Sequence, residues 1–279
     1  MAASSERMIL SLMLQIVEWV GIPFALFRLL PGWGLRAANF KGCEIPVGFG
    51  IYVVLWSISA FALLGRNFAL PYGTISNWII LLGAFGGLGF LDDIAGNRGS
   101  TGLKGHFSAL FRHGKVTTGL IKAIGGVVTA FILGSRMPHG GALTILLIGL
   151  IIALSSNAIN LLDLRPGRAG AMFFLLSIPL WVSSLWTFRL APIIFLIPPA
   201  LLMQWYDSRG KVMMGDAGSN VLGAALGYAF VTSNPSTFSM VAVLLLLTGL
   251  HLMAEKVSLS TEIEKRAWLR KLDSLTGVR

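Results

Sequence analysis

The sequence Phe90-Leu91-Asp92-Asp93 ends an apolar segment that begins near Ile75 and carries no charged residue before this acidic pair. Two neighbouring carboxylates repel each other unless a cation or a hydrogen-bond donor lies between them. An ionisable residue at the edge of a membrane span is a candidate functional residue, because burying it in lipid is costly. The stretch therefore predicts a membrane helix that presents two acids to a site at its end.

A similar change between apolar and acidic sequence occurs twice more. The stretch from Asn157 to Asp163 reads Asn-Ala-Ile-Asn-Leu-Leu-Asp and ends an apolar segment. The stretch from Met214 to Ser219 reads Met-Gly-Asp-Ala-Gly-Ser and begins another. The function depends on whether these three junctions meet on one side of one membrane.

The composition places the chain among polytopic membrane proteins. Of its 279 residues, 55% are hydrophobic and only 12% are charged, which is far outside the range of soluble domains. The net charge is +10. In so apolar a chain, basic loops beside anionic lipid explain this charge better than nucleic acid does. We therefore expect a multi-pass protein of the cytoplasmic membrane that has no nucleic-acid partner.

We predict an all-α polytopic membrane protein with about nine transmembrane helices, each near the roughly 20 residues that a helix needs to cross. The predicted spans are 8–30, 45–64, 75–92, 117–135, 142–162, 171–188, 190–206, 217–232 and 237–255.

The basic residues predict the orientation. With the N-terminus outside and the loops alternating, all but four of the 22 lysines and arginines fall on the inner side. This is a strong positive-inside signal, and it places the C-terminus in the cytoplasm. Most acids sort to the same side, so we expect an active-site cleft on the cytoplasmic face. Residues 1–256 then form one transmembrane domain, and residues 257–279 form a basic tail, either an interfacial amphipathic helix or a solvated segment.

The residue types at the junctions suit a phosphate that is bridged by magnesium. Magnesium takes one or two protein carboxylates and completes its octahedron with water and phosphate oxygens, while lysine and arginine offset the remaining charge. The Gly215-Asp216 turn begins a helix, where glycine permits close backbone approach and the helix N-terminus favours anions. The glycine-rich loop 96–106 is a weaker signal of the same kind, and a solvated loop explains it as well.

Four motifs in this order resemble the polyprenyl-phosphate N-acetylhexosamine-1-phosphate transferases. Three are the junctions above, and the fourth runs from Asn39 to Gly50, where a basic segment enters Ile-Pro-Val-Gly-Phe-Gly. The resemblance covers roughly residues 36–256. It implies transfer of a sugar-1-phosphate from a UDP-N-acetylhexosamine to polyprenyl (undecaprenyl) phosphate, which releases UMP and initiates a cell-envelope glycopolymer. It also implies Mg²⁺ as the cofactor, with Mn²⁺ as a substitute, and a homodimer.

The resemblance also implies roles for residues. Asp92, Asp93 and Asp216 would be catalytic: Asp216 as the main metal ligand, Asp93 in support of the metal, and Asp92 orienting or deprotonating the lipid phosphate. Since a phosphate monoester is largely ionised at neutral pH, we expect positioning and charge neutralisation to outweigh base catalysis. The implied substrate-binding residues are Lys41, Lys104, Lys115, Lys122, Asn157, Asn160, Asp163, Arg165, Arg168, Gly215, Gly218 and Ser219.

Three departures from the family pattern keep alternatives open. Pro166 replaces an expected aspartate, Met213 replaces an aromatic residue, and the four histidines form no cluster. Arg165 and Arg168 would then bind phosphate in place of the missing acid. One alternative is a catalytically impaired member that still binds polyprenyl phosphate or a nucleotide sugar. A second is a transporter, although transporters place polar groups near the midplane and often contain inverted repeats.

Overall fold

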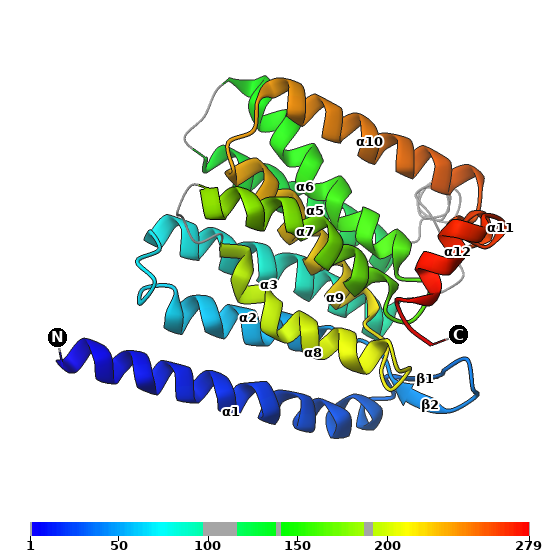
Figure 1. Ribbon diagram of the computed structural model, residues 1–279, viewed down its shortest axis with the longest axis horizontal. Coiled ribbons are helices and arrows are strands. Elements are labelled where there is room, and N and C mark those ends of the chain that lie inside the picture. The colour runs from blue at the N-terminus through cyan, green and yellow to red at the C-terminus, as the bar shows by residue number, and fades with distance from the viewer. Residues whose placement is uncertain (1, 97–115, 138–140, 187–191, 279) are drawn as a thin grey trace.

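The computed structural model describes residues 2–96, 116–137, 141–186 and 192–278, which form a bundle of helices and one small hairpin (Figure 1). Helix α1 (Ala2–Gly32) lies at one edge of the bundle and α10 (Thr237–Lys256) at the opposite edge. The other long elements are α2 (Ile51–Leu64), α3 (Tyr72–Ala95), α5 (Thr118–Ser135), α6 (Ala142–Leu162), α7 (Arg168–Trp186), the 3₁₀ helix η1 (Pro192–Leu196), α8 (Ile197–Asp207) and α9 (Gly215–Thr232).

Each predicted span corresponds to helical structure, the seventh to η1 followed by α8. Within the ranges that the structure describes, five helices are long and apolar enough to cross a membrane. They are Glu6–Gly32, Tyr72–Ala95, Thr118–Ser135, Ala142–Leu162 and Thr237–Lys256. This confirms the prediction of a multi-pass membrane protein. That all nine segments cross the bilayer stays a prediction.

The predicted start of the second span is wrong. Strand β2 (Glu44–Pro46) pairs antiparallel with β1 (Arg36–Ala38), with Ala37 opposite Ile45, and helix α2 begins only at Ile51. Pro46 has no backbone N–H to donate, and Gly48 has a φ of +73°, which a helix does not allow. In the described ranges, the regular structure is therefore helical apart from this hairpin.

Small residues bring α3, α6 and α9 unusually close together. A Cβ atom added to Gly89 of α3 would lie 2.4 Å from the carbonyl oxygen of Asp216, and one added to Gly223 of α9 would lie 2.2 Å from that of Ser155. Membrane helices associate through such small residues because their backbones can then touch. This packing holds the N-terminus of α9 against the last turns of α3 and α6.

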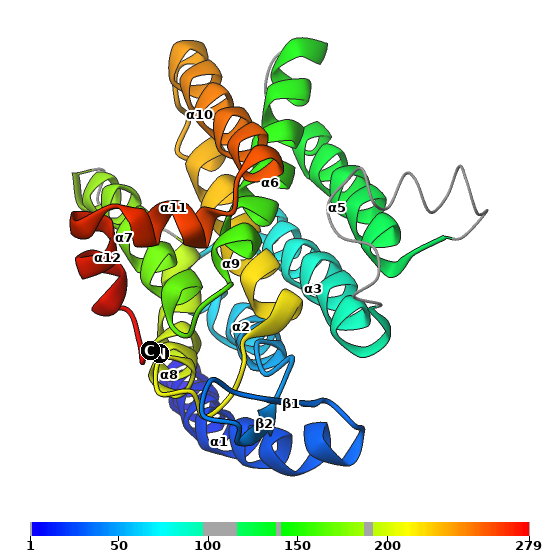
Figure 2. The same ribbon diagram turned by 90° about the vertical axis from the view of Figure 1, so that its right-hand side faces the viewer.

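The hairpin, the turn before α9 and the last two helices, α11 (Leu259–Lys265) and α12 (Ala267–Ser274), gather at one end of the bundle (Figures 1 and 2). We call this end the hairpin end. The hairpin is joined to the turn before α9, since Met213 N–H donates to Pro46 O at 2.8 Å and Phe49 N–H donates to Met213 O at 3.1 Å. The three acidic junctions therefore share one end of the molecule.

Candidate active site

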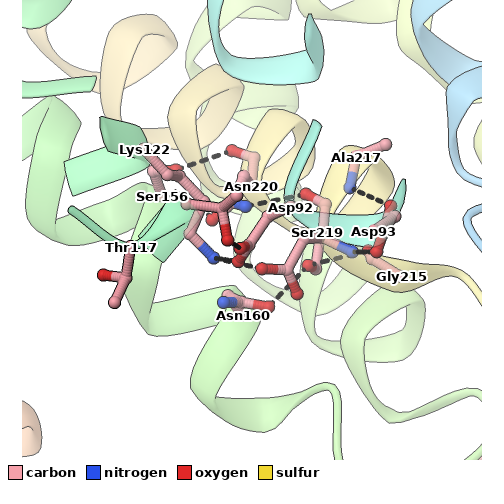
Figure 3. Close-up of polar contacts among 12 residues, drawn as sticks. Asp92, Asp93, Thr117, Lys122, Ser156, Asn160, Gly215, Ala217, Ser219 and Asn220 are labelled. Atoms are coloured by element: carbon pink, nitrogen blue, oxygen red, sulfur yellow. Dashed lines mark hydrogen bonds and ion pairs between the residues drawn. The ribbon is translucent and has the colours of Figure 1, made fainter. Parts of the chain in front are cut away.

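Lys122 on α5 lies between the carboxylates of Asp92 on α3 and Asp216 on α9 (Figure 3). Its Nζ donates to Asp92 Oδ2 at 2.8 Å and forms a second ion pair with Asp216. The hydroxyl of Thr118 donates to the other oxygen of Asp92. The three charged side chains are 18–27% exposed, so they are partly desolvated and remain accessible. The structure thus places a cation between two acids that the sequence set 124 residues apart.

Asp93 holds the first turn of α9. Its Oδ1 accepts the N–H of Asp216 at 2.8 Å, and its Oδ2 accepts the N–H of Ala217 at 3.0 Å (Figure 3). The first N–H groups of a helix have no partner within the helix, and a carboxylate also complements the helix dipole there. Gly215 has a φ of +73°, and a Cβ atom added there would lie 2.6 Å from Asp93 Oδ1. Asp93 and Gly215 therefore fix the position from which Asp216 projects.

Polar side chains of α6 complete the cluster around α9. Ser219 donates to Asn160 Oδ1 at 2.9 Å, and Ser156 donates to the carbonyl oxygen of Asn220 at 3.0 Å (Figure 3). The side-chain amide of Asn220 donates to the carbonyl oxygen of Asp216 at 2.7 Å. These bonds satisfy polar groups between packed helices and tie the α6 junction to the α9 junction.

A cavity of about 1620 Å³ opens beside these residues. Ligand pockets commonly measure about 300–1,000 Å³, so this cavity has room for a large substrate or for two. The predicted site residues that line it are Asp92, Asp93, Lys122, Asn157, Asn160, Asp163, Arg165, Gly215 and Asp216. Residues from all three junctions therefore face one space.

Asp163, which directly follows α6, and Asp207, the last residue of α8, both face this cavity. Burial raises the pKa of Asp207 to about 6, although the backbone N–H groups of Gly167 and Met214 act in the opposite direction. Burial, followed by the neighbouring carboxylate of Asp207, raises the pKa of Asp163 well above its usual range. Among the described residues that line the cavity, the carboxyl groups outnumber Lys122 and Arg165, which favours the arrival of a further cation.

Some predicted site residues lie away from the cavity wall. Lys41 is exposed near the rim, with its Nζ 5.4 Å from the ring centroid of Phe40, a residue that lines the cavity. Gly218 is buried against Gly50, which precedes α2, and Ser219 is buried against Asn160. Contact of Lys41, Gly218 or Ser219 with a substrate stays a prediction. Lys104 and Lys115 lie outside the described residues.

The two arginines after the α6 junction already have acidic partners. Arg165 lines the cavity and pairs with Glu264 of α11. Arg168 is 2% exposed and binds Asp273, which follows α11 in the chain. A phosphate would have to compete with these carboxylates, and phosphate binding by either arginine stays a prediction.

The arrangement of acids fits a magnesium ion that keeps most of its own water. No group of three or more His, Cys, Asp or Glu side chains in the described ranges forms a ready-made metal site. The carboxylates of Asp92 and Asp216 nevertheless lie close enough to pair with the same ammonium group of Lys122. Magnesium needs only one or two such oxygens in addition to water and phosphate. Both oxygens of Asp93 accept backbone donors, and its role as a ligand stays a prediction.

Three residues of the cluster, Thr118, Ser156 and Asn220, did not stand out in the sequence. Thr118 begins α5 one turn before Lys122, so the 3.6-residue period places it on the same face as that lysine. Asn220 directly follows Ser219 and reaches back one turn to Asp216. Their helical spacing from residues already identified was the available signal.

The helical bundle and the acid-lined cavity together define a multi-pass membrane protein with a polar site at one end of its helices. A sequence model of the family described as glycosyl transferase family 4 matches residues 75–234, which is more than half of the chain. The chain therefore belongs to glycosyl transferase family 4. This confirms the resemblance inferred from the four motifs.

Among the similar proteins are relatives named phospho-N-acetylmuramoyl-pentapeptide-transferase. The protein of Thermotoga neapolitana is 31% identical over 189 residues, which cover 65% of this chain and 61% of that relative. The protein of Fervidobacterium nodosum is 32% identical over 181 residues, which cover 63% of this chain and 57% of the relative. The chain thus spans about three fifths of the length of the curated relatives that it matches.

Proposed function

We propose that this protein transfers a sugar-1-phosphate from a UDP-N-acetylhexosamine to polyprenyl phosphate and so initiates a cell-envelope glycopolymer. An oxygen of the lipid phosphate forms a new bond to the sugar-bearing phosphorus of the donor. The bond from that phosphorus to the bridging diphosphate oxygen breaks, and UMP leaves with the electron pair.

The observation that carries this proposal is the Asp92–Lys122–Asp216 cluster at the edge of a large cavity. Phosphoryl transfer depends mainly on positioning and charge neutralisation. Lys122 would contact the phosphates, and Asp92 would orient the lipid phosphate and take any proton that it still carries. Asp93 would be a positioning residue, since it acts through the backbone of Asp216.

A magnesium ion would be held by Asp216, and it would neutralise the charge that develops on the diphosphate. Two adjacent carboxylates with a cavity beside them are a suitable donor set for that ion. Asn157, Asn160 and Asp163 would hold the uridine-phosphate part, because they line the same cavity on the α6 side.

The apolar part of the cavity supports the proposal that the acceptor is a lipid. Between the charged cluster and the middle of the bundle it is lined by small and apolar residues of three predicted spans, namely Phe85, Leu88, Ala123, Gly126, Val127, Ala153 and Leu154. A polyprenyl phosphate has a charged head on an apolar chain, and it needs both surfaces next to each other. Lys122 and Asp92 lie on the same faces of α5 and α3 as several of these apolar residues.

We further propose that nine segments cross the membrane and that the hairpin end faces the cytoplasm. The basic loops of the sequence support this orientation through the positive-inside rule. Nucleotide sugars and magnesium are available on that side. A homodimer is implied by the family resemblance alone.

The direct test uses the purified protein in lipid nanodiscs with undecaprenyl phosphate, Mg²⁺ and a panel of UDP-sugars that includes the muramoyl pentapeptide donor. We expect UMP release with a small UDP-N-acetylhexosamine, and we expect it to disappear in Asp216→Asn and Asp92→Asn. Glu262→Gln is the matched control, because this acid pairs with Lys265 on the exposed face of α11.

Two outcomes would replace the proposal. Binding of undecaprenyl phosphate without UMP release from any donor would favour the catalytically impaired member, which Pro166 and Met213 made an alternative. Movement of a solute across liposomes without a lipid-linked product would favour the transporter.

A further inference from the structure

Helices α11 and α12 are clamped to the start of α7 by one buried guanidinium. Arg168 donates from Nε to Asp273 Oδ1 at 2.7 Å and from Nη2 to Asp273 Oδ2 at 3.0 Å, and from Nη1 to Ser260 of α11 at 3.1 Å. The side chains of Arg168 and Asp273 are 3% and 11% exposed. A bidentate pair of this kind fixes orientation as well as distance. One residue therefore holds both α11 and α12.

The segment Asp273–Val278 starts at this clamp and contacts two turns of the hairpin end, one after α6 and one after α8. The side-chain amide of Gln204 donates to Thr276 O at 3.2 Å, and Val278 N–H donates to Ser208 O at 2.8 Å. A Cβ atom added to Gly277 would lie 2.3 Å from the carbonyl oxygen of Pro166. These contacts hold the backbone of Thr276–Val278 against the turns that follow α6 and α8.

The segment ends at the cavity. Val278 lines it together with Phe40, Asn39 and Gly210. A Cβ atom added to Gly210 would lie 3.0 Å from the Phe40 ring and 3.5 Å from a Val278 methyl, so these groups adjoin one another. The ring of Phe40 is 44% exposed. Phe40 and Val278 thus form an apolar surface of the cavity next to the β1–β2 hairpin.

We propose that Asp273–Val278 is a wall of the donor site and that Val278, held by the Arg168–Asp273 clamp, is a specificity-determining residue for the nucleoside part of the donor. This inference rests on the proposed function. Two parts of the cavity differ in chemistry: the Asp92–Lys122–Asp216 cluster suits phosphates, whereas Phe40 and Val278 offer no charge and suit the face of a planar base. A donor that reaches both parts would place its diphosphate at the charged cluster and its base against Phe40 and Val278.

The first experiment measures access to Val278 directly. Cys43, the single cysteine, is exposed on the hairpin and is replaced by serine. Val278→Cys is then introduced, and Leu275→Cys serves as the matched control, because Leu275 belongs to the same segment and is 78% exposed. Maleimide labelling is timed with and without UMP. At UMP ten times above its Kd, we expect labelling at position 278 to slow about tenfold and labelling at position 275 to stay unchanged.

The second experiment separates donor binding from acceptor binding. Val278→Trp places a larger side chain in the wall and should raise the KM for the UDP-sugar by about tenfold or more, while the KM for undecaprenyl phosphate stays unchanged. Asp273→Asn keeps the shape of the clamp and removes the negative charge of Asp273. It should also raise the KM for the UDP-sugar. Glu262→Gln, which alters the pair with Lys265 on α11 away from the cavity lining, is the control for the clamp.

The two proposals fail in distinguishable ways. One outcome is that the wild-type protein releases UMP, but UMP does not protect position 278 and Val278→Trp does not change the donor KM. It would contradict the donor-site role of Asp273–Val278 and leave the proposed transferase activity standing. Selective protection at position 278 without UMP release under any condition would keep the wall and overturn the transferase. Equal protection at positions 278 and 275 would also overturn the wall.

Discussion

Helices α9 and α10 follow each other in the chain, and the less apolar of the two, α9, is the more deeply buried. Helix α9 contains Asp216, Ser219, Asn220 and several glycines, yet almost every residue from Ala217 to Val231 is buried. Helix α10 is among the five strongly apolar helices of the described chain, yet Met240 is its one buried residue there. Lipid is as apolar as leucine, so hydropathy marks contact with lipid, and small residues mark contact between helices. Helix α9, which carries Asp216 into the polar site, is therefore buried by its neighbours although it is not among the five strongly apolar helices.

The largest expected effect is on catalysis at the start of α9. Lys122→Met keeps the length of the side chain and removes its charge, so Asp92 and Asp216 are left facing each other without a cation. We expect UMP release to fall about 100-fold, which is the usual cost of losing one charge-stabilising group. The control is Lys256→Met at the exposed end of α10, which should change the rate little. Equal activity of the two variants would show that the cluster is only structural.

The next effect concerns the pH dependence of stability at the entry to α9. Because the folded protein raises the pKa of Asp207 to about 6, it retains a proton that the unfolded chain has already lost. The stability from this group is complete below its ordinary pKa and is lost as the pH rises through 6, a fall of about 3 kcal/mol. Asp207→Asn should lack this fall. Melting temperatures at several pH values below and above 6 check it, with Glu264→Gln as the control.

A smaller effect tests the comparison directly with one substitution in each helix. A Cβ atom at Gly223 of α9 meets the carbonyl oxygen of Ser155, whereas one at Gly249 of α10 meets nothing within 4 Å. We expect Gly223→Ala to destabilise the protein by about 1–3 kcal/mol through overpacking. Gly249→Ala should be neutral, or stabilising by up to about 1 kcal/mol, because alanine favours the helix. Similar melting temperatures for both variants would contradict the packing of α9.

The smallest effect is expected on the lipid-facing side of α10. Leu246 is 75% exposed, so Leu246→Ala should change the unfolding free energy by less than about 0.5 kcal/mol. Leu222 of α9 is fully buried, and Leu222→Ala should cost about 2–5 kcal/mol through the cavity that it leaves. Thermal melting in one detergent measures both. A large loss at Leu246 would indicate that another protein surface covers α10.

Much of the architecture could be predicted from the chain alone. The nine apolar segments correspond to helices because hydropathy is a property of each segment and needs no partner. The one misplaced boundary, at α2, arose where Ile45 and Val47 continued the apolar pattern through Pro46 and Gly48. Backbone conformation overrides hydropathy at such residues.

The sequence predicted which acidic residues belong to the site better than it predicted which residues contact one another there. Asp92, Asp93 and Asp216 were identified because each junction is acidic, but Lys122 was one of three candidate lysines. Only packing decided that Lys122 lies between Asp92 and Asp216. The role of Asp93 at the start of α9 and the pairing of Arg168 with Asp273 were likewise absent from the sequence pattern.

By itself, the sequence determined that this chain is a multi-pass membrane protein of a particular transferase family, with acids at the ends of three helices. The tertiary structure decided which cation joins those acids and which segment of chain walls the cavity. The physical reason is the range of the interactions. Partition into lipid depends on each segment separately, whereas an ion pair such as Arg168–Asp273 forms only after helices far apart in the chain have packed.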